Sequence, residues 1–209
     1  FHPVKHVTTG EGGMITCESQ EHAEKMRMFR NHGISTSLRQ REASGSWYYE
    51  MCELGYNYRM TDIQCALGIS QLKKLAGWVE RRRAIAKIYD DSFAGNPRVK
   101  PLSIKRDVRH AFHLYVIRLE TDGSAGGRVE AFSRLRQMGI GVNVHYIPVH
   151  LHPFYRNNYG TSRGQCPVAE KAYEEILSLP MYPAMSDEMV TEVVNAVKIV
   201  AGEGGSPKR

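Results

Sequence analysis

The chain has 209 residues, of which 42% are hydrophobic, and this length and composition are typical of one large globular domain or two small ones. Its formal charge is +6, but the 28 basic residues are scattered among 22 acidic ones, which argues against a nucleic-acid-binding domain. No apolar run approaches the roughly 20 residues of a membrane-spanning helix, so we expect no membrane partner.

The chain begins with Phe1 rather than Met, and its first residues lack the pattern of a signal peptide. We therefore expect a truncated start or a further segment upstream. The four cysteines are widely spread, without a pair at metal-ligand spacing. This usage predicts reduced thiols in a cytoplasmic protein.

In chain order, the first elements lie around two glycine-rich turns. Residues 12–17 predict a turn that leads into a short strand, and residues 21–29 predict a helix that ends before Gly33. Residues 34–51 show no sustained period and carry Ser, Gly and Arg, so we expect a long loop there.

The clearest helix begins at Thr61, where Thr61 and Gln64 have the spacing of a capping box. Its apolar positions predict one continuous helix that runs past residues 81–83, an arginine run we expect to be a solvated face, toward Phe93. A Pro-containing break follows. We place the domain boundary near Gly95, with domains at residues 1–95 and 96–209.

Beyond this boundary, strands alternate with helices, which predicts an α/β or α+β domain. We expect strands at residues 112–119 and 141–146, with a helix at 128–138 between them. Two helices close the chain, one from Pro167 to about Ser178 and one that Ser186 caps.

The most informative motif surrounds Lys5 and reads F-H-x-x-K-x-x-T-T-G-E-G-G from Phe1 to Gly13. Glycines here permit a backbone to approach a ligand closely. An amine that condenses with an aldehyde must first lose its proton, which burial or a neighbouring cation such as His6 would promote. A lone lysine is more often solvated, so the prediction depends on the residues that flank it.

A second motif, Gly-Tyr-Asn-Tyr-Arg-Met, occupies residues 55–60 directly before the capped helix. This position places Asn57 and Arg59 where a helix N-terminus favours an anion. Arg59 could equally brace a loop through carbonyl groups.

A third stretch carries three histidines, His145, His150 and His152. Their spacing gives no strong reason for convergence on a metal ion, so we predict no metal site.

Together these motifs resemble the DegT/DnrJ/EryC1/StrS family of sugar aminotransferases, which use pyridoxal 5'-phosphate (PLP). The resemblance covers nearly the whole chain. It implies an α/β structure of fold type I, with the end of the large PLP-binding domain in residues 1–95 and the small C-terminal domain in 96–209. Lys5 would hold the cofactor as a Schiff base; related sugar dehydratases have histidine there, so Lys5 favours aminotransfer.

The resemblance also implies the remaining site residues. Asn57 would reach the cofactor phosphate of the partner subunit in a homodimer. Arg59, Tyr146 and His150 would contact the sugar nucleotide, and Glu11 would brace its loop. The motifs look most similar to those of the transaminase of pseudaminic acid biosynthesis, which implies a UDP-linked 4-keto-6-deoxy sugar as acceptor and glutamate as amino donor.

One departure concerns length, because family members are nearly twice as long. The missing part would supply the phosphate-binding turn, the group stacked on the cofactor ring and the Asp that pairs with the ring nitrogen. We therefore expect this chain alone to be inactive. It would belong to a longer polypeptide or pair with a separately made part. The alternative is a non-catalytic remnant that acts as a dimerisation or sugar-nucleotide-binding module.

Overall fold

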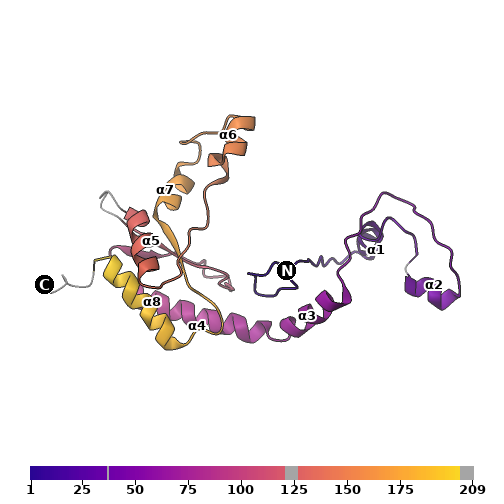
Figure 1. Cartoon of the computed structure of the whole chain (residues 1–209), viewed down its shortest axis with the longest axis horizontal. Coiled ribbons are helices and arrows are strands. Elements are labelled where there is room, and N and C mark those ends of the chain that lie inside the picture. The colour runs from indigo at the N-terminus through magenta and orange to yellow at the C-terminus, as the bar shows by residue number, and fades with distance from the viewer. Residues whose placement is uncertain (37, 121–126, 203–209) are drawn as a thin grey trace. The chain divides into compact units, whose positions relative to one another are not determined.

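The computed structural model describes residues 1–36, 38–120 and 127–202, without the side chains of residues 38 and 39. The chain is a mixed α/β structure in two compact units, Phe1–Leu75 and Ala76–Arg209 (Figure 1). The division between these units lies before the Gly95 boundary because Ile85, Tyr89 and Phe93 pack into the core of the second unit. The boundary between the domains of the complete protein stays a prediction.

The described part of the first unit contains three helices: α1 (Gln20–Phe29), α2 (Leu38–Ser44) and α3 (Asp62–Leu72). Helix α1 confirms its prediction, and the hydroxyl of Ser19 caps it by accepting a hydrogen bond from the His22 N–H. Two predictions were wrong. Helix α2 interrupts the expected loop, and no strand forms at residues 13–17, where the side chains of Met14 and Ile15 are exposed.

The single long helix predicted from Thr61 is also wrong, because the structure has two helices there. Helix α3 ends at Leu72, and helix α4 spans Leu75–Phe93. At the break the Lys74 N–H donates to the Gln71 carbonyl, three residues back, instead of the carbonyl four residues back. This tighter turn ends the regular helical hydrogen bonding of α3.

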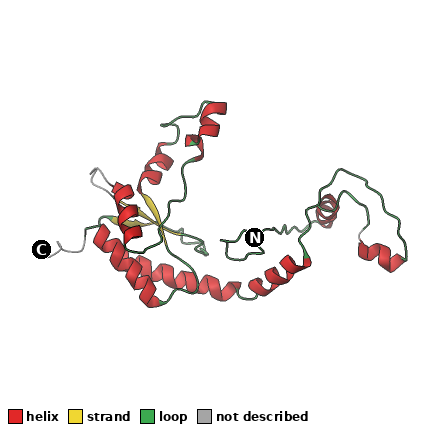
Figure 2. Ribbon diagram, viewed as in Figure 1, coloured by secondary structure: helices red, strands yellow, loops and turns green. Residues whose placement is uncertain are grey.

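The second unit is built on a three-stranded antiparallel sheet with the order β1-β2-β3 (Figure 2). Its strands are β1 (Val99–Pro101), β2 (Tyr115–Leu119) and β3 (Ile176–Leu179). The side chains of Tyr115, Ile117 and Leu119 are buried and alternate with partly exposed ones, as expected of a strand with one face in the core. The prediction of a strand at 112–119 is therefore confirmed for its second part; the positive φ of Phe112 (49°) is incompatible with a strand.

Helices complete the second unit: α5 (Gly127–Gln137), α6 (Pro153–Tyr159), α7 (Pro167–Glu175), α8 (Asp187–Val200) and a 3-10 turn, η1 (Val149–Leu151). Apolar side chains from α4, the strands, α5 and α8 form its hydrophobic core. The largest fully buried members are Tyr89, Phe93, Ile85, Ile117, Leu135, Leu177, Val99, Val190 and Val197. None of the described helices is both long and apolar enough to span a bilayer.

Two sequence predictions for the second unit need correction. Strand β3 lies partly in residues assigned to the helix from Pro167, which ends at Glu175. Residues 141–146 form no strand; Asn143 makes only an isolated bridge to Ser178. In addition, strand β1 lies just after the Pro-containing break, where no element was predicted. For β1 and β3, pairing with β2, not local pattern, decides the conformation.

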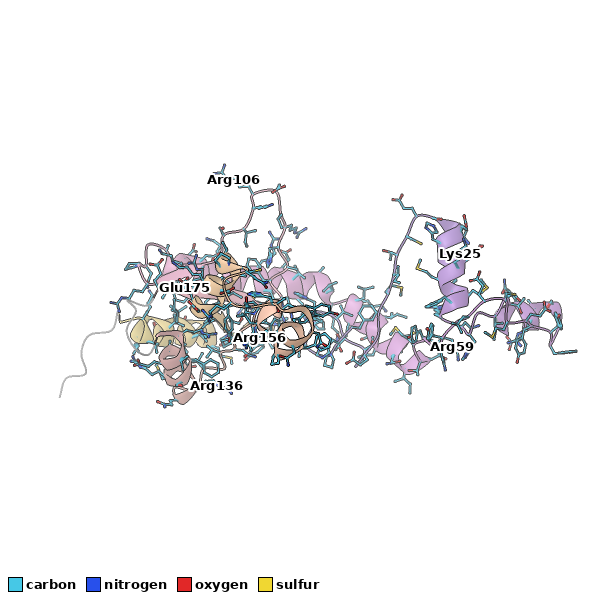
Figure 3. The ribbon with its side chains drawn as sticks, turned by 90° about the horizontal axis from the view of Figure 1, so that it is seen from above. Lys25, Arg59, Arg106, Arg136, Arg156 and Glu175 are labelled. Carbon is cyan, nitrogen blue, oxygen red and sulfur yellow. The ribbon has the colours of Figure 1, made fainter. Side chains whose placement is uncertain are left out.

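The arginine run on α4 is not simply a solvated face, because Arg82 is buried. Its Nη1 atom donates hydrogen bonds to the carbonyls of Phe112, His113 and Met181 at 3.0–3.2 Å. Burial lowers the pKa of this guanidinium. Arg82 thereby ties α4 to the segments before β2 and after β3. By contrast, Arg106 lies at the tip of the loop between β1 and β2, away from the sheet (Figure 3).

Candidate functional site

The loop that carries Lys5 is closed by hydrogen bonds at its neck. The Phe1 carbonyl accepts from the Thr9 N–H at 3.1 Å and from the Thr8 hydroxyl at 3.0 Å. Within the loop, the Lys5 N–H donates to the His2 carbonyl at 3.0 Å. Lys5 therefore lies in a defined turn, held at its base by the Thr-Thr pair.

The glycines after this turn have conformations that side chains disfavour. Gly10 has φ +80° and Gly12 has φ +145°, and a Cβ atom on Gly12 would lie 2.8 Å from the Thr9 hydroxyl. The Thr9 hydroxyl donates to the Glu11 carbonyl at 2.6 Å. Gly12 therefore permits a compact turn directly after Thr9.

Lys5 itself is exposed in this structure. The expected burial of this side chain is therefore not provided by the described residues, and the side chain is accessible to a small molecule.

The Gly-Tyr-Asn-Tyr-Arg-Met turn is anchored by a close crossing of two backbones. A Cβ atom on Gly55 would lie 2.1 Å from the Gly33 nitrogen, and one on Gly33 would lie 1.7 Å from the Glu53 carbonyl oxygen. Across this crossing the Tyr56 N–H donates to the Phe29 carbonyl at 2.7 Å. Only glycine fits at either position, so the two glycines fix how the turn packs against the end of α1.

This crossing presents Asn57 and Arg59 just before α3, where Figure 3 shows Arg59. Asn57 is exposed and pairs through its backbone with Asn31. The Arg59 guanidinium donates to the side-chain oxygen of Asn31 at 2.6 Å, which is a bracing contact. Thr61 and Gln64 form the predicted capping box at the start of α3.

The third motif lies in the second unit. Tyr146 is 71% exposed, whereas His150 is largely buried and its Nε2 atom lies 2.8 Å from Glu170 Oε1. His145 instead contacts the Ser178 hydroxyl through Nδ1 at 2.8 Å. Tyr146 is therefore accessible to a ligand, while one ring nitrogen of His150 already has a protein partner.

Sequence reasoning did not identify Glu170 as a partner of His150. Glu170 also accepts hydrogen bonds from the backbone N–H groups of Gly164 and Cys166. These contacts, with the bond to His150 the strongest, lower the pKa of the Glu170 carboxyl. The signal available in the sequence was an acidic residue in the first turn of a helix that starts with Pro.

The structure thus places Lys5, Asn57 and Arg59 in the first unit, and Tyr146 and His150 in the second. Within the described ranges, no cluster of three His, Cys, Asp or Glu side chains has a metal-binding arrangement. The residue types are compatible with PLP, because a primary amine can condense with its aldehyde and an amide N–H group can donate to its phosphate.

Comparison with known proteins gives a consistent result. The model of the DegT/DnrJ/EryC1/StrS aminotransferase family matches residues 1–198. The spore coat polysaccharide biosynthesis protein SpsC of Bacillus subtilis is 42% identical over 205 residues, which cover 97% of this chain and 53% of that protein.

Solved structures agree with this match. PseC of Helicobacter pylori, an aminotransferase involved in the biosynthesis of pseudoaminic acid, superposes with a TM-score of 0.85 at 30% identity, over 98% of this chain and 52% of PseC. The PLP form of Spr1654 from Streptococcus pneumoniae gives 0.82 at 31% identity, over 97% and 50%. The chain therefore spans about half the length of these relatives.

Proposed function

The chain belongs to the DegT/DnrJ/EryC1/StrS aminotransferase family, and we propose that the complete protein transfers an amino group from glutamate to a nucleotide-linked 4-keto-6-deoxy sugar. The observation that carries this proposal is Lys5, held in a closed turn next to the Thr-Thr-Gly-Glu-Gly-Gly backbone. A sugar substrate is supported by PseC and SpsC, which act in sugar and polysaccharide biosynthesis.

In this proposal PLP, when bound, supplies an electron sink for the substrate carbon. Lys5 would hold the cofactor at rest. Its Nζ atom would then act as the base and the acid that move a proton at the substrate carbon. Lys5 thereby serves both the glutamate half-reaction and the sugar half-reaction.

The other proposed roles concern binding. Asn57 would donate to the cofactor phosphate of the partner subunit in a cytoplasmic homodimer, and its exposure is compatible with that contact. Arg59 and Tyr146 would contact the sugar nucleotide. We propose that His150 also contacts the sugar nucleotide, through ring atoms other than the Nε2 atom that meets Glu170.

A UDP-linked sugar of pseudaminic acid biosynthesis is the acceptor we propose, with PseC as support. The 42% identity to SpsC supports a cell-surface polysaccharide as the wider destination. We also propose that this chain without the rest of the protein is inactive, because it spans only about half the length of its relatives and its described residues leave Lys5 exposed.

A second candidate, a non-catalytic remnant, has the same exposure in its favour. The two are distinguished by the reading frame upstream of Phe1. A phosphate-binding Gly-Thr turn and an Asp-bearing strand there would support the enzyme, whereas their absence would support a dimerisation or sugar-nucleotide-binding module.

The direct test is to incubate the complete protein with PLP, reduce it with borohydride and map the modified peptide. We expect the label on Lys5 in the wild type and none on that peptide in Lys5→Ala, with Lys25→Ala as a control that keeps the label. Label on another lysine would contradict the assignment. Candidate keto sugars are then assayed with glutamate to identify the acceptor.

A further inference from the structure

One face of α3 holds the loop that carries Lys5. Gln64, Gly68 and Gln71 are spaced four and three residues apart, which places them in one stripe along the helix. The Gln71 side-chain oxygen accepts a hydrogen bond from the Thr8 N–H at 2.9 Å. The Gln64 side-chain nitrogen donates to the Glu11 carbonyl at 3.0 Å. The two glutamines thus hold the loop backbone at two points.

Gly68 lies between these two glutamines and lets the loop approach the helix. A Cβ atom there would lie 3.0 Å from the Thr9 methyl carbon, a distance at which the neighbour would have to move. Thr9 is only 4% exposed, in a loop whose other residues are exposed or half-buried. The stripe therefore combines close packing at its centre with a hydrogen bond at each end.

The contacts of this stripe reach Lys5 through the Thr-Thr pair. The Thr8 hydroxyl and the Thr9 N–H both donate to the Phe1 carbonyl and thereby close the loop. A shift of Thr8 would open this neck and change the direction in which the turn at Lys5 points. The link to α3 spans 63 residues of sequence, so it fixes the loop against a separate element.

We propose that Gln71 and Gln64 are positioning residues for Lys5, which set the placement of its amine through the loop backbone that they hold. This inference rests on the proposed function in one respect, namely that Lys5 is the residue that captures the cofactor. Positioning matters because a misplacement of about 1 Å can cost a catalyst roughly a hundredfold in rate.

The two glutamine side chains differ in whether they accept or donate hydrogen bonds, so each contact can be removed or kept by a chosen substitution. Gln71 acts only as an acceptor toward Thr8, so Gln71→Glu keeps the contact and Gln71→Met removes it. The side-chain oxygen of Gln64 accepts from the Thr61 N–H in the helix cap, and its side-chain nitrogen donates to the Glu11 carbonyl. Gln64→Glu therefore keeps the cap and removes only the contact with the loop.

The test uses the complete protein and measures hydrogen exchange of the Thr8 amide, together with the pH dependence of the visible absorbance of bound PLP. We expect Gln71→Met to raise the exchange rate about tenfold and to shift the absorbance profile. Gln71→Glu should restore both. Gln137→Met, at an exposed position on α5, should change neither.

Turnover provides a further readout. We expect Gln71→Met and Gln64→Glu to lower kcat by roughly tenfold or more, with a smaller change in the KM of the sugar nucleotide. Unchanged exchange and unchanged absorbance in both variants would overturn the proposal. If Gln71→Met fails to fold, Gln64→Glu decides, since its helix cap is intact.

The failure of the proposed function would look different. In that case borohydride would leave Lys5 of the wild type unlabelled, whatever the exchange rate of the Thr8 amide. A labelled Lys5 with unaltered exchange and unaltered absorbance in both variants would instead refute the positioning role alone.

Discussion

The carboxylate of Glu170 lies 2.8 Å from the Nε2 atom of His150, and both side chains are largely buried. Glu170 lies on α7, and His150 lies in η1, so the pair joins two segments that are 20 residues apart. Because its hydrogen bonds favour the charged form, the pKa of the Glu170 carboxyl is lowered in the folded protein.

This pair predicts a pH-dependent stability. A carboxyl with a lowered folded pKa stabilises the fold above its ordinary pKa of about 4.3, and this contribution is lost as the pH falls through the folded pKa. We expect Glu170→Gln to lower the melting temperature at pH 7 and to differ less from the wild type below about pH 4. Thermal unfolding of both proteins between pH 7 and about pH 4 measures this difference in melting temperature. Glu192→Gln, an exposed control on α8, should show little change, and a difference independent of pH would contradict the prediction.

Replacing Arg82 should destabilise the second unit. In Arg82→Met the carbonyls of Phe112, His113 and Met181 lose their common donor, which we expect to cost about 2–4 kcal/mol. Urea unfolding measures the change. The exposed Lys87→Met on the same helix should stay within about 0.5 kcal/mol, and an equal effect of both variants would refute the role of Arg82.

The backbone crossing before α3 predicts a local effect of an added methyl group. Gly33→Ala should displace Glu53 and release the Tyr56 N–H from its bond, which hydrogen exchange at Tyr56 detects. The control is Gly45→Ala. There φ is also positive (+64°), but an added Cβ atom would meet no atom within 4 Å beyond its chain neighbours. It should cost only the backbone strain of roughly 1–2 kcal/mol and leave Tyr56 unchanged. Protection of Tyr56 in both variants would show that the crossing tolerates a side chain.

Removing the amine of Lys5 should affect chemistry rather than folding. In the complete protein we expect Lys5→Ala to lower turnover by roughly a hundred- to ten-thousandfold, the range in which a general acid–base group contributes. Because Lys5 is exposed, the circular dichroism spectrum should match that of the wild type. Full activity of this variant in a glutamate-dependent assay would exclude the proposed role.

Local sequence signals predicted much of this structure. Helices α1, α5 and α8 and the capping box of α3 follow from side-chain period and capping residues, which act within a few positions of the chain. The placement of Asn57 and Arg59 before a helix also agrees with the prediction from their motif.

Features that depend on distant partners were not predictable in this way. The residues of β3 continue a helical pattern, and only pairing with β2 makes them a strand. Likewise the burial of Arg82 depends on carbonyls 30 and 99 residues away. The same holds for the contact between His150 and Glu170 and for that between Gln71 and Thr8. A side-chain hydrogen bond between separate elements produces no periodic pattern in the sequence.

The described hydrophobic core lies entirely between Ile85 and Ala201, whereas the described part of Phe1–Leu75 has only Thr9 and Gly33 buried. Heat capacity and melting cooperativity arise mainly from buried apolar surface. The unfolding transition that calorimetry measures for this chain would thus report on the second unit and not on the turn at Lys5. Melting temperature alone would therefore not detect the effect of variants in the turn to which we assign the catalytic role.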